Sequence, residues 1–317
     1  MSATGSDLVT TDIDRAVARL DAGGVVAIPT ETVYGLAALA DRPDAIRRMY
    51  AIKGRPTDHP SIVHVADVDH VHEWAVLPDG RATILATACW PGPLTLLLAR
   101  GPRVADEVTG GRPTVGIRVP AHPMTNALLR RLDGAVAAPS ANRFGQVSPT
   151  TAAHVVADLG DLLDPERDAI LDGGPCPVGI ESTIIDCTVA PPQVLRPGGI
   201  PTEDVERLLD GALAPAAGPV RAAGMLASHY APRCRVHLAT DRAAADATQQ
   251  RIGAAGRAVG VLDRTDDLVA ATRHLYADLR DADRRGLDDL VVVLPPPAGL
   301  GHALRDRLTK AAADRPG

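Results

Sequence analysis

A lysine and an arginine lie close together in one short segment of this chain. Only two of its 33 basic residues are lysines, and the first of them begins the segment Lys53-Gly54-Arg55-Pro56. A compact ammonium next to a planar guanidinium is a combination that phosphate groups commonly require. The alternative is a surface lysine that closes a helix, with Gly54 as its C-cap. The segment alone leaves both interpretations open.

Several polar segments share one arrangement, because each follows or ends a run of apolar residues. The sequence has no GxxxxGK[ST] loop, kinase signature or GxSxG elbow, so a phosphate site here must be assembled from separated side chains. Ligands gather at strand ends in α/β sheets, and we expect these segments to converge there. They are residues 30–35, 53–56, 118–120, 139–142 and 181–183, and residues 195–198 add a further arginine.

Each of these segments also has a purely structural interpretation. Residues 30–32 read equally as an N-cap box, and Ser140 and Asn142 as turn formers. Arg118 and Arg196 read equally as surface ion pairs, worth under about 1 kcal/mol each. The combination of so many Arg, Ser and Thr residues at strand ends favours a binding site.

Four histidines near the first lysine invite a metal interpretation. His59, His64, His70 and His72 fall among the carboxylates Asp58, Asp67, Asp69 and Glu73. The spacing matches no zinc pattern, and two residues apart on a helix His70 and His72 would face different ways. We therefore predict no transition-metal site and expect His70 and His72 to be solvated. His64, inside an apolar strand, either faces a pocket or is a satisfied buried histidine.

Composition limits the class of protein. A chain of 317 residues suits about two domains, and an aromatic content of 2% means that its cores are aliphatic. The net charge of −6 argues against a general polyanion binder. The four cysteines are scattered without a CxxC, the N-terminus lacks a signal-peptide pattern, and no apolar run reaches membrane-spanning length. We expect a soluble, cytoplasmic protein with reduced thiols and no membrane contact.

The order of apolar patterns predicts an α/β fold in two parts. Strands are expected at residues 25–28, 62–65, 94–99, 115–119, 135–138, 169–171 and 183–185, and helices at 11–20, 44–52, 124–132, 151–159 and 202–209. This first domain is assigned to residues 1–210. Residues 211–232 are rich in Ala, Pro and Gly, which indicates a linker. Three β-α units then predict a small doubly wound domain over residues 233–317, whose strands are expected at 235–238, 259–262 and 290–294 and helices at 243–252, 268–279 and 300–312.

In this order the polar segments resemble those of the YrdC-type L-threonylcarbamoyladenylate synthases. The shared motifs are TETVYGL, KGRP, WPGPLT, RVPAHP, APSAN, SPT, ESTI and LRPGG, and so many ordered matches are far more specific than any one motif. The HYAP segment at residues 229–232 and the run from Pro295 to Gly301 are similar to the long, two-domain form of the family. The resemblance implies a YrdC-like twisted mixed sheet, a flexible linker acting as a lid, and a small Rossmann-like three-layer C-terminal domain.

The resemblance also implies an ATP-dependent nucleotidyltransferase. L-Threonine and bicarbonate (or CO2) would give N-carboxythreonine, whose carboxylate attacks the α-phosphate of ATP and releases pyrophosphate. The product, L-threonylcarbamoyl-AMP, would serve threonylcarbamoyladenosine modification of tRNA next to the anticodon through a separate transferase complex. Mg2+ would be held mainly by the nucleotide phosphates, and a weak contact with RNA stays open.

The family's site residues carry over by position. Lys53 and Arg55 are expected to be the catalytic cations. The expected ATP-binding residues are Lys53, Arg55, His59, Thr114, Ser140, Asn142, Ser148, Arg196 and Tyr230. The expected L-threonine-binding residues are Thr32, His64, Arg118, Ala138 (through its main chain) and Ser182. No general base is required once the carbamate has formed, because such a site mainly positions the substrates and neutralises charge.

Two departures and two alternatives accompany this prediction. Ser61 stands where the family usually has a larger apolar residue, and the linker is less basic than in some relatives. An RNA-binding protein that grips structured RNA is the competing class, although the few aromatic residues and the acidic balance argue against it. The second domain, finally, is expected either to regulate the enzyme or only to scaffold the lid.

Overall fold

The computed structural model describes residues 7–78, 80–211, 213–218, 224 and 229–313. Residues 212, 219–223 and 225–228 of the expected linker and lid lie outside the described residues, and the domain boundaries there stay a prediction. Among the helices described, none combines the length and apolar character that crossing a bilayer requires.

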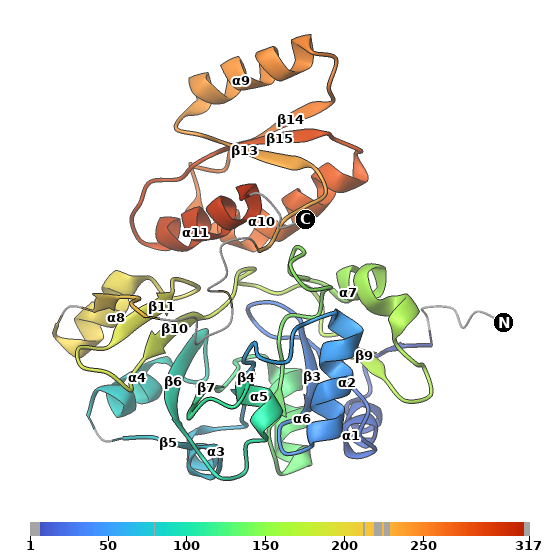
Figure 1. Ribbon diagram of the computed structural model, residues 1–317, viewed down its shortest axis with the longest axis vertical. Helices are drawn as coiled ribbons and strands as arrows, with labels where there is room; N and C mark the ends of the chain where they lie inside the picture. The colour runs from blue at the N-terminus through green and yellow to red at the C-terminus, as the bar shows by residue number, and fades with distance from the viewer. Residues whose placement is uncertain (1–6, 79, 212, 219–223, 225–228, 314–317) are drawn as a thin grey trace.

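One large mixed sheet organises the first part of the chain (Figure 1). Its strands follow the order β1-β9-β2-β3-β8-β4-β7-β6-β10-β11-β12, and β5 pairs with β6. Parallel neighbours such as β4 and β7 alternate with antiparallel ones such as β7 and β6. The strands are β1 (Val9–Thr10), β2 (Val26–Ile28), β3 (Gly35–Leu39), β4 (Ile62–His64), β5 (Ala75–Val76), β6 (Leu94–Arg100), β7 (Thr114–Arg118), β8 (Val136–Ala137), β9 (Ala169–Leu171), β10 (Thr183–Asp186), β11 (Gln193–Arg196) and β12 (Ala214–Pro215).

Helices cover both faces of this sheet, and alternate strand residues decide which helix each face contacts. In β2, Val26 and Ile28 share an apolar cluster with α1 and α6, whereas Ala27 belongs to the cluster that contains α2 and α7. The helices of this part are α1 (Ile13–Asp21), α2 (Pro43–Lys53), α3 (Val71–Trp74), α4 (Arg81–Cys89), α5 (Asp106–Thr109), α6 (Pro123–Leu132), α7 (Ala152–Leu159) and α8 (Thr202–Leu209). A buried sheet with helices on both faces is the layered α/β architecture that the sequence predicts.

The second part is a separate three-stranded parallel sheet. Its elements follow in strict alternation as β13 (Arg235–Ala239), α9 (Arg242–Ala254), β14 (Val259–Leu262), α10 (Leu268–Arg284), β15 (Asp289–Val293) and α11 (Leu300–Ala312). The strand order is β13-β15-β14. Figure 1 shows α9 on one side of this sheet and α10 with α11 on the other. The predicted Rossmann-like, three-layer domain is therefore confirmed.

The two parts contact each other through α10 and α11, which face the large sheet domain (Figure 1). Leu275 and Leu279 of α10 and Leu304 of α11 belong to one buried apolar cluster with Val33 and Ile180 of the first part. This shared cluster holds the second domain against the strand ends where the predicted site residues lie.

Candidate active site

A pocket of about 580 Å³, including the part open to solvent, lies where the large sheet domain meets the second domain. It lies at the ends of β2, β4, β7 and β11 and in the turns that follow them. Nine of the predicted site residues line it: Thr32, Arg55, His64, Arg118, Ala138, Ser140, Ser182, Arg196 and Tyr230. The expected convergence of distant polar segments is thus observed, while the ligand that each residue contacts stays a prediction.

Arg118, at the end of β7, is buried in a network of polar groups. Its Nη2 donates to Glu31 Oε1 at 2.6 Å and its Nη1 to Thr32 Oγ1 at 2.9 Å, while Nε donates to the Gly92 carbonyl at 3.2 Å. The side chain is only 5% exposed. The interpretation of Arg118 as a surface ion pair is therefore wrong. The segment around Glu31 begins no helix, so the N-cap interpretation is wrong as well.

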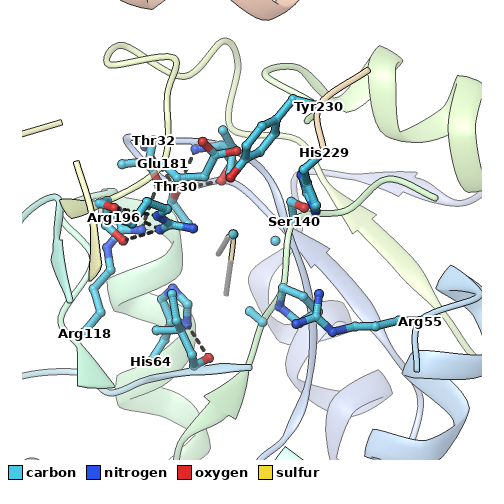
Figure 2. Close-up of a pocket in the computed structure, with 17 residues that line it drawn as sticks. Thr30, Thr32, Arg55, His64, Arg118, Ser140, Glu181, Arg196, His229 and Tyr230 are labelled. Atoms are coloured by element: carbon cyan, nitrogen blue, oxygen red, sulfur yellow. Dashed lines mark hydrogen bonds between the residues drawn. The ribbon is translucent and has the colours of Figure 1, made fainter. Parts of the chain in front are cut away.

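Arg196, at the end of β11, is also buried. Its Nε and Nη2 donate to the Ser182 carbonyl at 3.1 and 2.9 Å, and Nη2 also reaches Ser182 Oγ at 3.1 Å. Burial is the main cause that lowers its pKa from the usual arginine value. Figure 2 shows Arg118 and Arg196 on one side of the pocket and Arg55 on the opposite side. The surface interpretation of Arg196 is wrong too.

Lys53 ends α2, and Gly54 after it adopts the left-handed conformation with φ 63°, so the C-cap interpretation of Gly54 is correct. Lys53 itself is only 3% exposed and is not a surface residue. Its ammonium donates to the carbonyls of Ser140 and Asn142. Burial and, to a smaller extent, the charge of Arg55 lower the pKa of Lys53 well below the usual lysine value. The ammonium therefore binds the 139–142 turn and lies behind the pocket wall instead of lining it.

Arg55 reaches the pocket itself. Its Nη2 donates to the Pro60 carbonyl at 2.7 Å. The guanidinium also lies over the rings of Tyr50 and Phe144, at 5.7 and 5.8 Å from their centroids. Aromatic faces stabilise a guanidinium in this position. The Pro60 carbonyl and the two rings thus hold the guanidinium of Arg55 while it faces the cavity.

His64 lies beside Arg118 at the end of β4. Burial and, to a smaller extent, the charge of Arg118 lower the pKa of His64 to about 3. The imidazole is neutral at physiological pH, and its Nδ1 donates to the Ile62 carbonyl at 3.2 Å, which leaves Nε2 as an acceptor. Of the two interpretations left open by the sequence, the one in which His64 faces a pocket is correct.

Four other predicted residues lie outside the lining of this pocket. The His59 ring packs against Phe144 at 5.3 Å, and Asn142 Nδ2 donates to the Arg143 and Gln146 carbonyls, as a turn former does. Ser148 Oγ donates to Glu181 Oε1 at 2.6 Å. Thr114 begins β7, four residues before Arg118, which corresponds to about 13 Å along a strand. The structure gives Thr114 the least support as a ligand contact.

Glu181 is a pocket residue that the sequence analysis leaves without a role. Its Oε1 accepts from Ser148, and its Oε2 accepts from Tyr276 Oη and Arg307 Nε, both at 2.7 Å. Burial acts to raise its pKa, but the charges of Arg307 and Arg196 outweigh burial and lower it to about 2. Glu181 is therefore ionised. Only the ESTI motif pointed to this residue, since its partners in α10 and α11 are distant in sequence.

Tyr230 closes the pocket on the side of the second domain. Its backbone has φ 62°, a conformation that a bulky residue adopts only where its surroundings hold it. The ring packs on Tyr276 at 5.7 Å between centroids and on His229 at 4.2 Å. The residue is fully buried, and burial raises its pKa to about 12. The HYAP segment is thus packed into the site and does not project into solvent.

A mixed α/β domain that gathers three arginines, a neutral histidine and several hydroxyls in one pocket belongs to the class of proteins that bind small anionic ligands. Two family models match this chain. The first is described as Sua5/YciO/YrdC, telomere recombination, and matches residues 18–198; the second is described as the C-terminal domain of threonylcarbamoyl-AMP synthase and matches residues 200–313.

Curated relatives share both parts. The threonylcarbamoyl-AMP synthase of Pyrococcus abyssi is 36% identical over 92% of this chain and 92% of its own length. That of Bacillus subtilis is 38% identical over 96% and 93%. The crystal structure of P. abyssi Sua5 complexed with L-threonine matches 95% of this chain and 94% of that one, with a TM-score of 0.89. The chain belongs to the Sua5 family of threonylcarbamoyl-AMP synthases, and its function is the synthesis of threonylcarbamoyl-AMP.

Proposed function

We propose that this chain is a nucleotidyltransferase that joins L-threonine, bicarbonate (or CO2) and ATP into L-threonylcarbamoyl-AMP and releases pyrophosphate. The observation that carries the proposal is that Arg55, Arg118 and Arg196, from three distant segments, line one pocket. An amino-acid carboxylate and a triphosphate are both anionic, and several separate guanidinium groups suit them.

The threonine side of the pocket is assigned to Arg118 and its neighbours. The hydrogen bonds of Arg118 to Glu31, Thr32 and Gly92 use three of its five N–H donors. One N–H therefore remains on each Nη, and together they suit a carboxylate. Neutral His64, whose Nδ1 donates to the Ile62 carbonyl, can accept a hydrogen bond from the substrate at Nε2 without adding charge.

The phosphate side is assigned to Arg55 and Arg196, with Lys53 behind the wall. A carbamate oxygen, itself anionic, must approach a phosphorus atom surrounded by negative oxygens, so the transition state needs positive charge nearby. The new bond joins this oxygen to the α-phosphorus, while the bond from the α-phosphorus to the bridging oxygen of the β-phosphate breaks. Pyrophosphate leaves with the electron pair, and no proton has to be moved by the protein in this step.

Mg2+ is proposed to enter and leave as part of the nucleotide substrate. Among the described residues that line the pocket, Glu181 is the carboxylate, and both of its oxygens already accept hydrogen bonds from Ser148, Tyr276 and Arg307. Hard cations prefer free carboxylate, phosphate and water oxygens. The phosphates are the better ligands here, and Arg55 and Arg196 would supplement the ion in neutralising charge.

The wider role is proposed from the product. A mixed anhydride of carbamate and AMP is an activated acyl donor, so a separate transferase would consume it, modifying adenosine beside the anticodon of tRNA in the cytoplasm. A pocket sheltered by the packed HYAP segment would protect this labile compound from water.

The test is pyrophosphate release by the purified full chain with ATP, Mg2+, L-threonine and bicarbonate, and with each left out in turn. The expected result is release only from the complete mixture, together with the threonylcarbamoyl-AMP mass in the products. Pyrophosphate release that does not depend on threonine contradicts the proposal. Stabilisation in a thermal-shift scan by tRNA, with none by ATP plus threonine, favours the RNA-binding alternative.

A further inference from the structure

Two residues of the second domain bind the side chain of Glu181, which lines the pocket of the first domain. Tyr276 of α10 and Arg307 of α11 both donate to Glu181 Oε2 at 2.7 Å. The Arg307 side chain is completely buried, and that of Glu181 is 7% exposed. Glu181 depends on this partner, because without Arg307 it would be a desolvated carboxylate, whereas Arg307 also pairs with Asp306 beside it in α11.

The same helix also holds the lid side of the pocket. The guanidinium of Arg307 lies 5.1 Å from the centroid of the Tyr230 ring. One turn further along α11, Lys310 donates to the Gly224 carbonyl at 2.6 Å and pairs with Asp306. Gly224 and Tyr230 both line the pocket. Lys310 and Lys53, the two lysines of the chain, therefore act in a similar way, since each binds the backbone of a segment at the pocket.

Charge explains why this arrangement matters to the reaction. Glu181 places a negative charge at a pocket that, on the proposed function, receives a triphosphate. An uncompensated carboxylate there would repel the nucleotide and weaken the effect of Arg196, its neighbour in the wall. Arg307 cancels that charge from behind, where it makes no contact with the cavity.

We propose that Arg307 is a positioning residue of the synthase: by pairing with Glu181 and packing on Tyr230, it completes the nucleotide side of the pocket from the second domain. The second domain is then more than a scaffold or a separate regulator, because its docking neutralises the charge of Glu181 and fixes the position of Tyr230. This inference rests on the proposed function for its substrate.

The experiment is a double-mutant cycle in the full chain with Arg307→Met, Glu181→Gln and the two combined. Arg307→Met leaves the Glu181 carboxylate buried and unpaired, and we expect kcat/KM for ATP to fall about 100-fold. In the double variant both charges are absent, so no buried carboxylate is left without its partner. We therefore expect kcat/KM for ATP to recover by at least about 10-fold relative to Arg307→Met. The affinity for L-threonine alone, measured by calorimetry, should change less than about two-fold in every variant.

Arg280→Met is the matched control. Arg280 of α10 forms another ion pair between the domains, with Asp158 of α7 at 2.6 Å; the two side chains are partly buried, and Arg280 does not line the site pocket. It should lower the melting temperature to an extent comparable with Arg307→Met and leave kcat/KM for ATP within about three-fold of the wild type. Equal kinetic losses in the two variants would show that only domain docking matters and would overturn the inference.

Two further outcomes separate the inference from the function on which it rests. An active wild type whose Arg307→Met variant is folded and unchanged, or whose double variant is no better than the single one, overturns the positioning role alone. A wild type that releases no threonine-dependent pyrophosphate overturns the proposed function itself. Should Arg307→Met fail to fold, the double variant and Arg307→Lys give the same comparison, since Arg307→Lys keeps the charge and is expected to retain most of the activity.

Discussion

His64 of β4 lies directly opposite Arg118 of β7 in the register of these two parallel strands. Residues paired in this way point to the same face of a sheet, so a neutral imidazole and a guanidinium enter the pocket side by side. The charge of Arg118 helps to keep His64 unprotonated.

The stability of the protein should depend on pH through His64. Its pKa of about 3 lies below the usual 6.5, so the unfolded state binds a proton that the folded state does not. The contribution of His64 is fully present above pH 6.5 and is lost as the pH falls toward 3. We expect up to about 2 kcal/mol less stability from this source at pH 5 than at pH 7. Urea unfolding of the wild type and His64→Gln at both pH values isolates the effect.

His72→Gln is the control for that experiment, because His72 is exposed on α3. This variant should follow the wild type at both pH values. If His64→Gln loses as much stability between pH 7 and pH 5 as the wild type does, then His64 is not the buried neutral group described above.

Arg118→Ala should raise the threonine requirement more than the ATP requirement. It should also destabilise the fold by about 3 kcal/mol or more, because Glu31 remains as a buried carboxylate without its partner. Calorimetry with L-threonine, combined with the KM for each substrate, measures the first effect and thermal unfolding the second. Equal effects on the two substrates would count against placing threonine at Arg118.

Lys53→Ala should reduce both activity and stability. The ammonium binds the carbonyls of Ser140 and Asn142 in a buried position, and two acceptors left without a donor cost about 2 kcal/mol or more. Activity falls as well, because the 139–142 turn carries Ser140 into the pocket. Lys53→Met keeps the apolar stem and separates the loss of the charge from the loss of packing. A fully stable Lys53→Ala variant would contradict the buried bridge.

Phe144→Leu should weaken nucleotide binding without abolishing the reaction. Phe144 is the one phenylalanine of the chain, and its ring supports the guanidinium of Arg55. Loss of a cation–π contact worth about 0.5 to 1 kcal/mol predicts a rise in the KM for ATP of about two- to five-fold. The KM for threonine is the internal control. If that KM rises and the KM for ATP does not, Arg55 contacts threonine and not the nucleotide.

Local patterns were sufficient to predict most elements of the fold. The helix at 202–209, the strand at 169–171 and the strand at 259–262 have the predicted limits, since each is a short apolar or amphipathic run with clear ends. The strand β3 (Gly35–Leu39) was not predicted. It is built from Gly, Ala and Leu, residues of weak strand propensity, and it becomes a strand because β2 and β8 pair with it on both sides.

The site was predictable only as far as motifs allowed. Arg55, Arg118 and Arg196 each lie in a recognisable motif, and all three line the pocket. The carbonyl contacts of Lys53 could not be foreseen, because they depend on how the 139–142 turn passes the end of α2. The pairing of Glu181 with Arg307 joins residues 126 positions apart in two domains, and no periodicity in the sequence reports such a contact.

The most direct test of the central claim is a crystal structure of the full chain with L-threonine, Mg2+ and a non-hydrolysable ATP analogue. We predict the threonine carboxylate on the two remaining Nη N–H groups of Arg118, and the phosphates between Arg55 and Arg196 in the same pocket. Phosphates bound elsewhere, or threonine seated away from Arg118, would contradict the account.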